Sequence, residues 1–192
     1  MMDYKFSGVK PSHLAAALIA FLLFTGSFQL NQLLDQYMLF APGVSLIFIP
    51  AGVKLLCLLV GGLPAAIGLF AASIYLSVAL WTDLPTLSIY YFALISVASH
   101  AAAIALVMGR FKIRTDLGNL NYWHIVALSA LAGILNGFAH NVVYLTQGVT
   151  SPADFFGKAT AMAFGDFLGC FVVVLLFNLG ISLMQHVRLG NR

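Results

Sequence analysis

Two ionisable side chains interrupt stretches that are otherwise apolar. Lys54 lies in GVSLIFIPAGVKLLCLLVGG, and Asp166 lies in KATAMAFGDFLGCFVVVLLFNLG. An ionisable group at the centre of a bilayer costs roughly 2.5–3.5 kcal/mol on insertion scales, so such groups usually face the interior of a helix bundle and have a partner there. Because the two residues are opposite in charge, we expect them to pair if their helices are neighbours, and they mark the candidate site.

The composition assigns the chain to the membrane. Of its 192 residues, 61% are hydrophobic and only 8% are charged, whereas a soluble domain carries about 25% charged residues. The net charge of +3 does not indicate nucleic-acid binding, because most of the nine Lys and Arg residues flank apolar stretches, where basic residues set topology. The two cysteines lie inside apolar stretches, which excludes a disulfide framework, and we expect neither a metal nor a cofactor.

Six apolar stretches are long enough to cross the membrane, since about 20 residues span a hydrocarbon core of roughly 30 Å. They cover approximately residues 12–30, 43–61, 62–81, 87–109, 122–146 and 160–185. Between the second and third, Gly61-Gly62-Leu63-Pro64 combines glycines with a proline at a helix start, which predicts a tight turn. The sequence therefore predicts an all-α integral membrane protein with six transmembrane helices, forming a single polytopic domain over residues 1–192.

The distribution of basic residues predicts the orientation. They fall in the N-terminal tail, in the connection after the fourth span and in the C-terminal tail: Lys5, Lys10, Arg110, Lys112, Arg114, Arg188 and Arg192. The connections after the first and third spans contain no Lys or Arg. By the positive-inside rule, and because six is an even number, both termini are expected in the cytoplasm.

Three spans place polar side chains at similar depth. With a rise of about 1.5 Å per residue, Lys54 lies roughly 16 Å below the outer edge of the core, Asp166 roughly 9–11 Å below it, and the polar residues of the fifth span roughly 7–15 Å below it. Asn136 and His140 are four residues apart and share a helix face. The sequence predicts a ligand or ion site in the outer half of the bundle, made by Lys54, Asn136, His140, Asn141 and Asp166.

A structural role for these residues stays open, because polar side chains also hold membrane helices together. Small residues predict close packing nearby: Gly133 and Gly137 form one GxxxG pattern, and Gly165 and Gly169 form another. No nucleotide-binding, hydrolase or metalloenzyme motif is present. We therefore predict no catalytic residue and no enzymatic activity.

Three segments resemble a known family. They read Ile49-Pro50-Ala51-Gly52-Val53, then Gly61-Gly62-Leu63-Pro64, then Gly165-Asp166-Phe167-Leu168-Gly169. In these the chain resembles the bacterial membrane-associated sensor domain of the first class, an integral sensory domain usually fused to histidine kinase or cyclic-di-GMP modules. The chain has fewer spans than that family and carries no output domain. The resemblance implies a sensor-like protein of the bacterial inner membrane that acts through a signalling partner.

The architecture is also similar to that of the substrate-binding membrane subunit of energy-coupling-factor vitamin transporters. Those subunits have six helices, a ligand site near the outer face and a small-xxx-small face near the N-terminus, for which Ala16 and Ala20 are candidates here. This resemblance implies vitamin-type uptake with an ATPase module as partner. A structural subunit of a membrane complex, or a homo-oligomer, is the third hypothesis.

Overall fold

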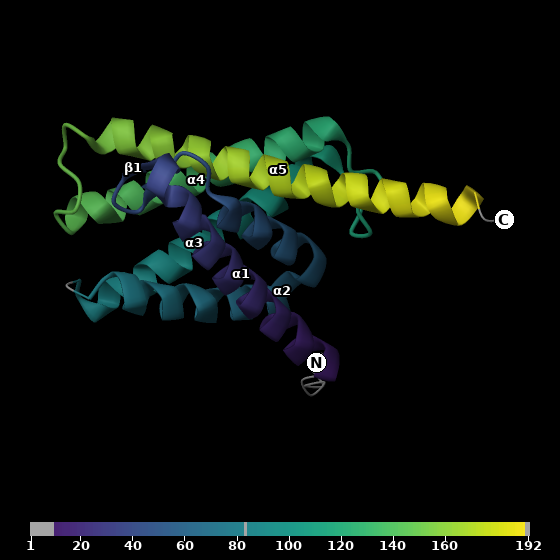
Figure 1. The fold of residues 1–192 in the computed structure, drawn as a ribbon, viewed down its shortest axis with the longest axis horizontal. Helices are drawn as coiled ribbons and strands as arrows, with labels where there is room; N and C mark the ends of the chain where they lie inside the picture. The colour runs from purple at the N-terminus through teal and green to yellow at the C-terminus, as the bar shows by residue number, and fades with distance from the viewer. Residues whose placement is uncertain (1–9, 83, 191–192) are drawn as a thin grey trace, which may run out of the picture.

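The computed structural model describes residues 10–82 and 84–190, with side chains up to residue 180, and it is almost entirely helical (Figure 1). The elements are α1 (Pro11–Met38), β1 (Leu39–Ala41), β2 (Val44–Ser45), α2 (Ile49–Leu80), α3 (Thr86–Phe111), α4 (Tyr122–Thr146) and α5 (Phe155–Gly190). All five helices of the described part are long and apolar enough to cross a membrane. The prediction of an all-α, multi-pass membrane protein is confirmed at this level.

Local sequence signals explain where several helices begin. Pro11 and Pro50 occupy the first turns of α1 and α2, where a missing backbone N–H leaves no hydrogen bond unmade. Asn121 caps α4: its side chain accepts from the His124 backbone N–H, and His124 Nδ1 accepts from the Asn121 backbone N–H. This reciprocal cap explains why α4 covers the same residues as the predicted span 122–146.

Helix α2 reverses direction in its middle. Gly62 has φ 56° and ψ −138°, a conformation outside the helical region, and Pro64 follows it. Figure 1 shows the two halves of α2 folding back toward the same end of the bundle. The predicted turn at Gly61–Pro64 is therefore present, and α1 packs against the resulting helical hairpin, with Ala20 and Phe24 buried among α2 residues.

The segment before α2 is not helical as the sequence predicts. The predicted span 43–61 begins as helix only at Ile49, and β1 and β2 instead form a two-stranded antiparallel hairpin with Gly43 at φ 74° in its turn. The predicted first span is also too short, because α1 continues to Met38. The second difference arises because Asn31 and Asp35 lower the hydropathy of the last turns of α1, yet their side chains bond to Ile49 and Ser45 rather than to water.

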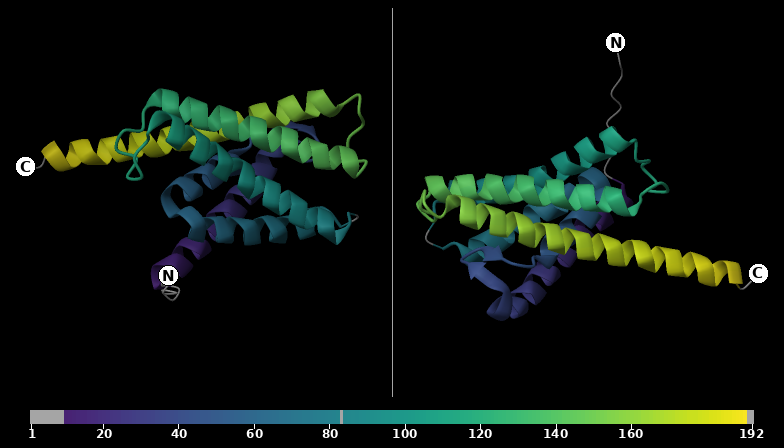
Figure 2. Two further views of the ribbon diagram at one scale, coloured as in Figure 1. Left: turned by 180° about the vertical axis from the view of Figure 1, so that it is seen from behind. Right: turned by 90° about the horizontal axis from the view of Figure 1, so that it is seen from above.

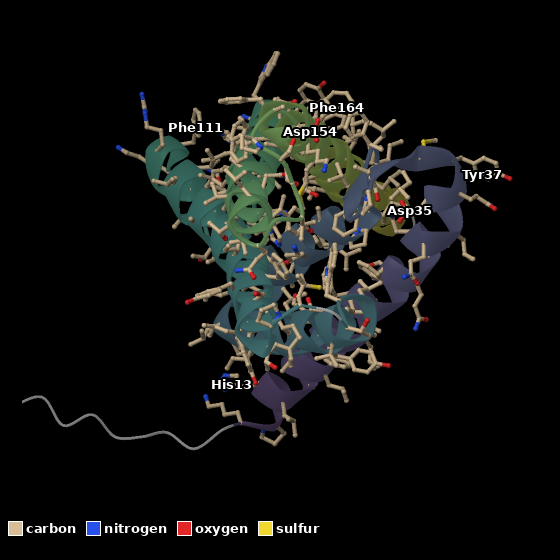
Figure 3. All side chains as sticks on the ribbon, turned by 90° about the vertical axis from the view of Figure 1, so that its left-hand side faces the viewer. His13, Asp35, Tyr37, Phe111, Asp154 and Phe164 are labelled. Carbon is tan, nitrogen blue, oxygen red and sulfur yellow. The ribbon has the colours of Figure 1, made fainter. Side chains whose placement is uncertain are left out.

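Helices α4 and α5 lie side by side, with α3 on the other side of α4 (Figure 2). Large apolar side chains project outward around the bundle, and Figure 3 shows Phe111 and Phe164 among them. Tyr37 also points away from the bundle and is 79% exposed. Such a surface suits lipid rather than water. Of the residues that predict the orientation, Lys5, Arg192 and the side chain of Arg188 lie outside the described part.

Gly62→Ala is expected to lower the free energy of unfolding by about 1–3 kcal/mol, because only glycine adopts its φ and ψ without strain. The space beside Gly62 is open, with no atom within 4 Å of an added Cβ, so steric contact does not contribute. Gly26→Ala is the matched control: its added Cβ also meets nothing, but Gly26 is helical. Unfolding in detergent should show a loss for Gly62→Ala alone; equal stability of both variants would contradict the assigned turn.

Candidate functional site

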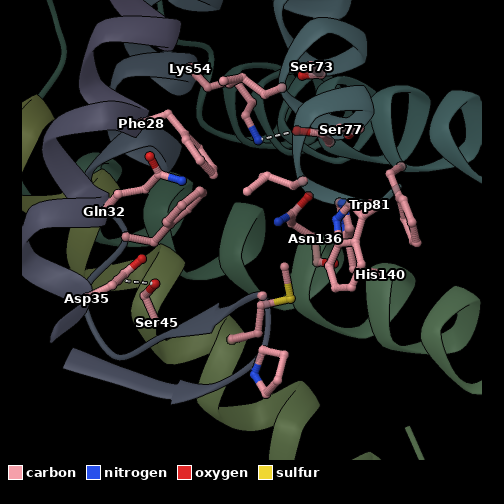
Figure 4. Close-up of a pocket in the computed structure, with 18 of the residues that line it drawn as sticks. Phe28, Gln32, Asp35, Ser45, Lys54, Ser73, Ser77, Trp81, Asn136 and His140 are labelled. Atoms are coloured by element: carbon pink, nitrogen blue, oxygen red, sulfur yellow. Dashed lines mark hydrogen bonds between the residues drawn. The ribbon is translucent and has the colours of Figure 1, made fainter. Parts of the chain in front are cut away.

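A cavity of about 370 Å³ lies where the β1–β2 hairpin meets the five described helices, with α5 contributing Met162. We call the end of the bundle that holds Met38, the hairpin, Trp81 and Thr146 the hairpin end. The cavity extends inward from that end: Pro42 and Gly43 line it there, and Lys54, Ser73 and Ser96 line it further inside. Figure 4 shows Lys54 and Ser73 on the wall opposite Ser45 of the hairpin. Residues from all five described helices and from the hairpin therefore converge on one space.

Lys54 is 1% exposed, and its ammonium faces this cavity. Its Nζ donates to Ser96 Oγ at 2.5 Å and lies 5.3 Å from the centre of the Phe24 ring. Among the described residues it makes no ion pair. An ammonium carries three donors, so at least two remain available to a ligand or to water.

Asp166 is equally buried but has a different partner. Asn136 Nδ2 donates to Asp166 Oδ2 at 2.5 Å, while Oδ1 has no hydrogen-bond partner among the described residues. The carboxylate borders a separate small cavity of about 20 Å³ beside Ser45 and Phe48. The predicted contact between Lys54 and Asp166 is therefore wrong. Lys54 bonds to Ser96 instead, and Asp166 bonds to Asn136.

Of the five predicted site residues, three line the main cavity: Lys54, Asn136 and His140. His140 Nδ1 lies 3.2 Å from the Asn136 carbonyl oxygen, one helical turn away; because a carbonyl only accepts, Nδ1 carries a proton. Asn141 is fully buried away from the cavity and donates to the Gly137 carbonyl and to Met162 Sδ. It holds α4 against α5, so the structure places it in a packing interface and not in the site.

Four rings form what we call the aromatic wall: Trp81, Phe92, His140 and Tyr144. The His140 and Phe92 rings are stacked, with centroids 5.9 Å apart and planes 8° apart. The Tyr144 ring meets the Phe92 ring edge-on, with centroids 5.2 Å apart. The centroid of the Trp81 ring lies 6.1 Å from that of Phe92 and 5.8 Å from that of Tyr144. All four residues line the cavity. Such a wall offers an aromatic surface against which a ligand ring can pack edge-on or offset.

The two glycine pairs have different neighbours. An added Cβ at Gly137 would lie 2.6 Å from the Ala163 backbone nitrogen, so Gly133 and Gly137 allow α4 to approach α5. Gly165 and Gly169 face the backbone carbonyls of Ser45 and Phe48 instead. The Phe48 N–H also donates to the Gly165 carbonyl at 3.1 Å. The glycines of α5 thus form a groove for the non-helical segment that leads into α2.

Several cavity residues were not predicted from the sequence. Ser73 comes from α2, Trp81 follows α2 directly, and Ser96 comes from α3. The hairpin segment is joined to α1 by a network in which Ser45 Oγ donates to Asp35 Oδ1 at 2.7 Å and Asn31 Oδ1 accepts from the Ile49 N–H at 2.9 Å. The spacing of Asn31 and Asp35, four residues apart on an apolar helix, is the signal that could have found this network.

Double-mutant cycles distinguish the partners of Asp166. Asn136→Ala and Asp166→Ala should show a coupling free energy of about 1–3 kcal/mol, because the residues share a buried, charge-assisted hydrogen bond. Lys54→Met combined with Asp166→Ala should show a clearly smaller coupling, because their hydrogen bonds go to different partners. Free energies of unfolding in detergent provide the measurement, and a larger coupling for the Lys54 cycle would restore the ion pair that the structure lacks.

No family model, no curated protein and no solved structure matches this chain. The likeness to the membrane-associated sensor domain and the architectural likeness to the transporter subunit consequently rest on the sequence segments described above.

Proposed function

We propose that this chain is a non-enzymatic, six-pass protein of the bacterial inner membrane that binds a small ligand in the outer half of its bundle and signals through a protein partner. The observation that carries the proposal is the cavity of about 370 Å³, whose inner wall holds the buried, unpaired ammonium of Lys54. Ligand pockets in proteins have volumes of about 300–1,000 Å³ and combine apolar walls with a few convergent polar groups. This cavity has both properties.

The chain crosses the membrane six times if the two halves of α2, on either side of Gly62, each form one pass and the other four helices form one pass each. The half of α2 before Gly62 has 13 residues, Ile49 to Gly61, too few for a core of about 30 Å. The hairpin segment makes up the remaining length, which a membrane tolerates only where irregular backbone is buried in protein or lines a cavity. The hairpin end then lies outside, because Arg110, Lys112 and Arg114 lie at the opposite end, between α3 and α4.

Binding is favoured over catalysis by the setting of Ser96. A serine bonded to a lysine is the pair used by some hydrolases, and Lys54 contacts Ser96 here. However, Ser96 lies in the middle of α3, where the adjacent backbone N–H groups are engaged within the helix. An oxyanion needs donors aimed at it, and this position supplies none from its own backbone.

A route from the cavity to a partner runs along α5. This helix has 36 residues and is about 54 Å long at 1.5 Å per residue, and Figure 1 shows its C-terminal part projecting beyond the bundle. Its glycine groove holds the segment that forms one wall of the cavity. A ligand that shifts this segment would therefore change the position of α5. A kinase or cyclase module that contacts α5 is the partner whose activity would respond to that change.

Uptake of a small solute is the second candidate, favoured by a cavity that opens at the proposed outer end. The face suggested for docking an ATPase module is partly occupied, since Ala20 is 1% exposed against α2. A purely structural role is less favoured because Ser73 Oγ and Asn136 Oδ1 are buried without hydrogen-bond partners among the described residues. Both residues line the cavity, unlike Ser129 and Asn141, whose Oγ and Oδ1 are also buried without partners among the described residues. Co-purification of an ATPase would favour uptake, and that of a kinase or cyclase would favour sensing.

Filling the cavity tests ligand binding. In wild-type protein, a metabolite extract should raise the thermal unfolding temperature in a saturable way, because a ligand that binds only the folded state stabilises it. Ser77→Phe places a ring in the cavity and should abolish the shift. The control is Val78→Phe, on the neighbouring residue, which is 55% exposed and does not line the cavity. Loss of the shift in both variants, or its absence in wild-type protein, would contradict the proposed function.

Fusion reporters test the six-pass arrangement. A fluorescent protein that folds only in the cytoplasm should be active after Arg192 and within the connection 112–121, and a phosphatase that is active only outside should report from the connection 147–154. The reason is the asymmetry of basic residues between these connections. A fusion at Arg192 that reports from the outside would contradict a cytoplasmic C-terminus and with it the proposed topology.

A further inference from the structure

The two opposite charges that line the main cavity are not paired with each other among the described residues. Of the residues that line the cavity, Lys54 and Asp35 are the two whose side chains are ordinarily charged at neutral pH. Asp35 is half-buried at the hairpin end and already accepts hydrogen bonds from Asn31 and Ser45. Lys54 is buried on the opposite wall with one hydrogen bond, to Ser96. A buried charge needs a compensating partner, so the inner wall of the cavity favours an anion.

The polar groups near Lys54 are suited to a carboxylate. Ser73 lines the cavity, and its Oγ is buried with no hydrogen-bond partner among the described residues; Figure 4 shows Ser73 and Lys54 in the same part of the cavity wall. The ammonium and this hydroxyl are both donors. A carboxylate can accept from both at once, and hydrogen bonds to ionised groups are about twice as strong as neutral ones.

The remaining surfaces indicate what the carboxylate is attached to. The aromatic wall lies along one side of the cavity, and Phe24 and Phe28 line the other. Rings stack on such surfaces with favourable geometry. Asn136 also lines this space; its amide nitrogen donates to Asp166, and its Oδ1 is buried without a hydrogen-bond partner among the described residues. An N–H or O–H group on the ligand would satisfy it.

We propose that the cavity binds a small aromatic monocarboxylate, with its carboxylate at Lys54 and Ser73, its ring against the aromatic wall and a donor group at Asn136. This inference rests on the proposed ligand-binding function and specifies its ligand class. An amine would bring a second positive charge to Lys54, and a neutral lipid chain would leave Lys54, Ser73 and Asn136 unsatisfied. Asp166 does not itself line the main cavity; it borders the adjoining small cavity, which shares Ser45 and Phe48 with the main one.

Three probes with the same ring separate the charge states: indole-3-acetate, indole-3-acetamide and tryptamine. Purified protein in nanodiscs should be stabilised against thermal unfolding by millimolar indole-3-acetate, and much less by the neutral amide or the amine. If the amide or the amine stabilises the protein as well as the acid, the pocket binds ligands but the anion assignment is wrong. If none of the three acts while a metabolite extract still stabilises wild-type protein, the aromatic monocarboxylate class is wrong and the proposed function stands.

Two variants locate the carboxylate. Lys54→Met should weaken binding of indole-3-acetate at least about 25-fold, and it should not lower the stability of the ligand-free protein, since it removes an unpaired buried charge. Ser73→Ala should weaken binding about 5-fold or more. Ser129→Ala is the matched control, because Ser129 Oγ is also buried and unpartnered but does not line the cavity. Unchanged affinity in Ser73→Ala and Lys54→Met, or equal loss in Ser129→Ala, would overturn the placement.

Discussion

The structure depends on the contact between a non-helical backbone segment and the glycine groove of α5. The Ser45 and Phe48 carbonyls lie against Gly165 and Gly169, at positions where any side chain on α5 would overlap them. The Phe48 N–H bonds to the Gly165 carbonyl, and the Ile49 N–H bonds to the Asn31 side chain on α1. In lipid, unsatisfied backbone groups cost several kcal/mol each by order of magnitude. These contacts allow the chain to leave the helical conformation inside the bundle, and the hairpin that results forms one wall of the cavity.

The second organising feature is the free-energy cost of buried polar groups whose hydrogen-bonding capacity is only partly used. Asn141 and the Asp166–Asn136 hydrogen bond consolidate the α4–α5 interface. Lys54, Ser73 and Asn136 Oδ1 differ, because they are buried and still have bonding capacity directed at an enclosed space. A protein that needed these residues only for stability would be better served by apolar side chains of similar size. Their retention is the physical argument for a ligand.

The sequence predicted the helices well where local rules decide them. The boundaries of α4 match because Asn121 and His124 form a local cap, and the turn at Gly62 follows from glycine and proline chemistry. The prediction was wrong at residues 43–48, whose apolar composition suits either a membrane helix or a buried extended segment. It was also wrong about the contact between Lys54 and Asp166, since opposite charge and similar depth do not specify which side chain stands between two groups.

By itself, the sequence determined that this chain is a multi-pass helical membrane protein with buried polar residues at similar depth, because hydropathy, helix rise and the cost of charge in lipid are properties of residues and their spacing. Only the tertiary structure decided that Lys54 bonds to Ser96, that Asp166 lies behind Asn136, and that Trp81 and Phe92 from α2 and α3 complete the wall beside His140. Partners on different helices are set by packing angles and rotations about helix axes, which a linear pattern does not encode. The two charges therefore have different hydrogen-bond partners, and of the two only Lys54 lines the main cavity.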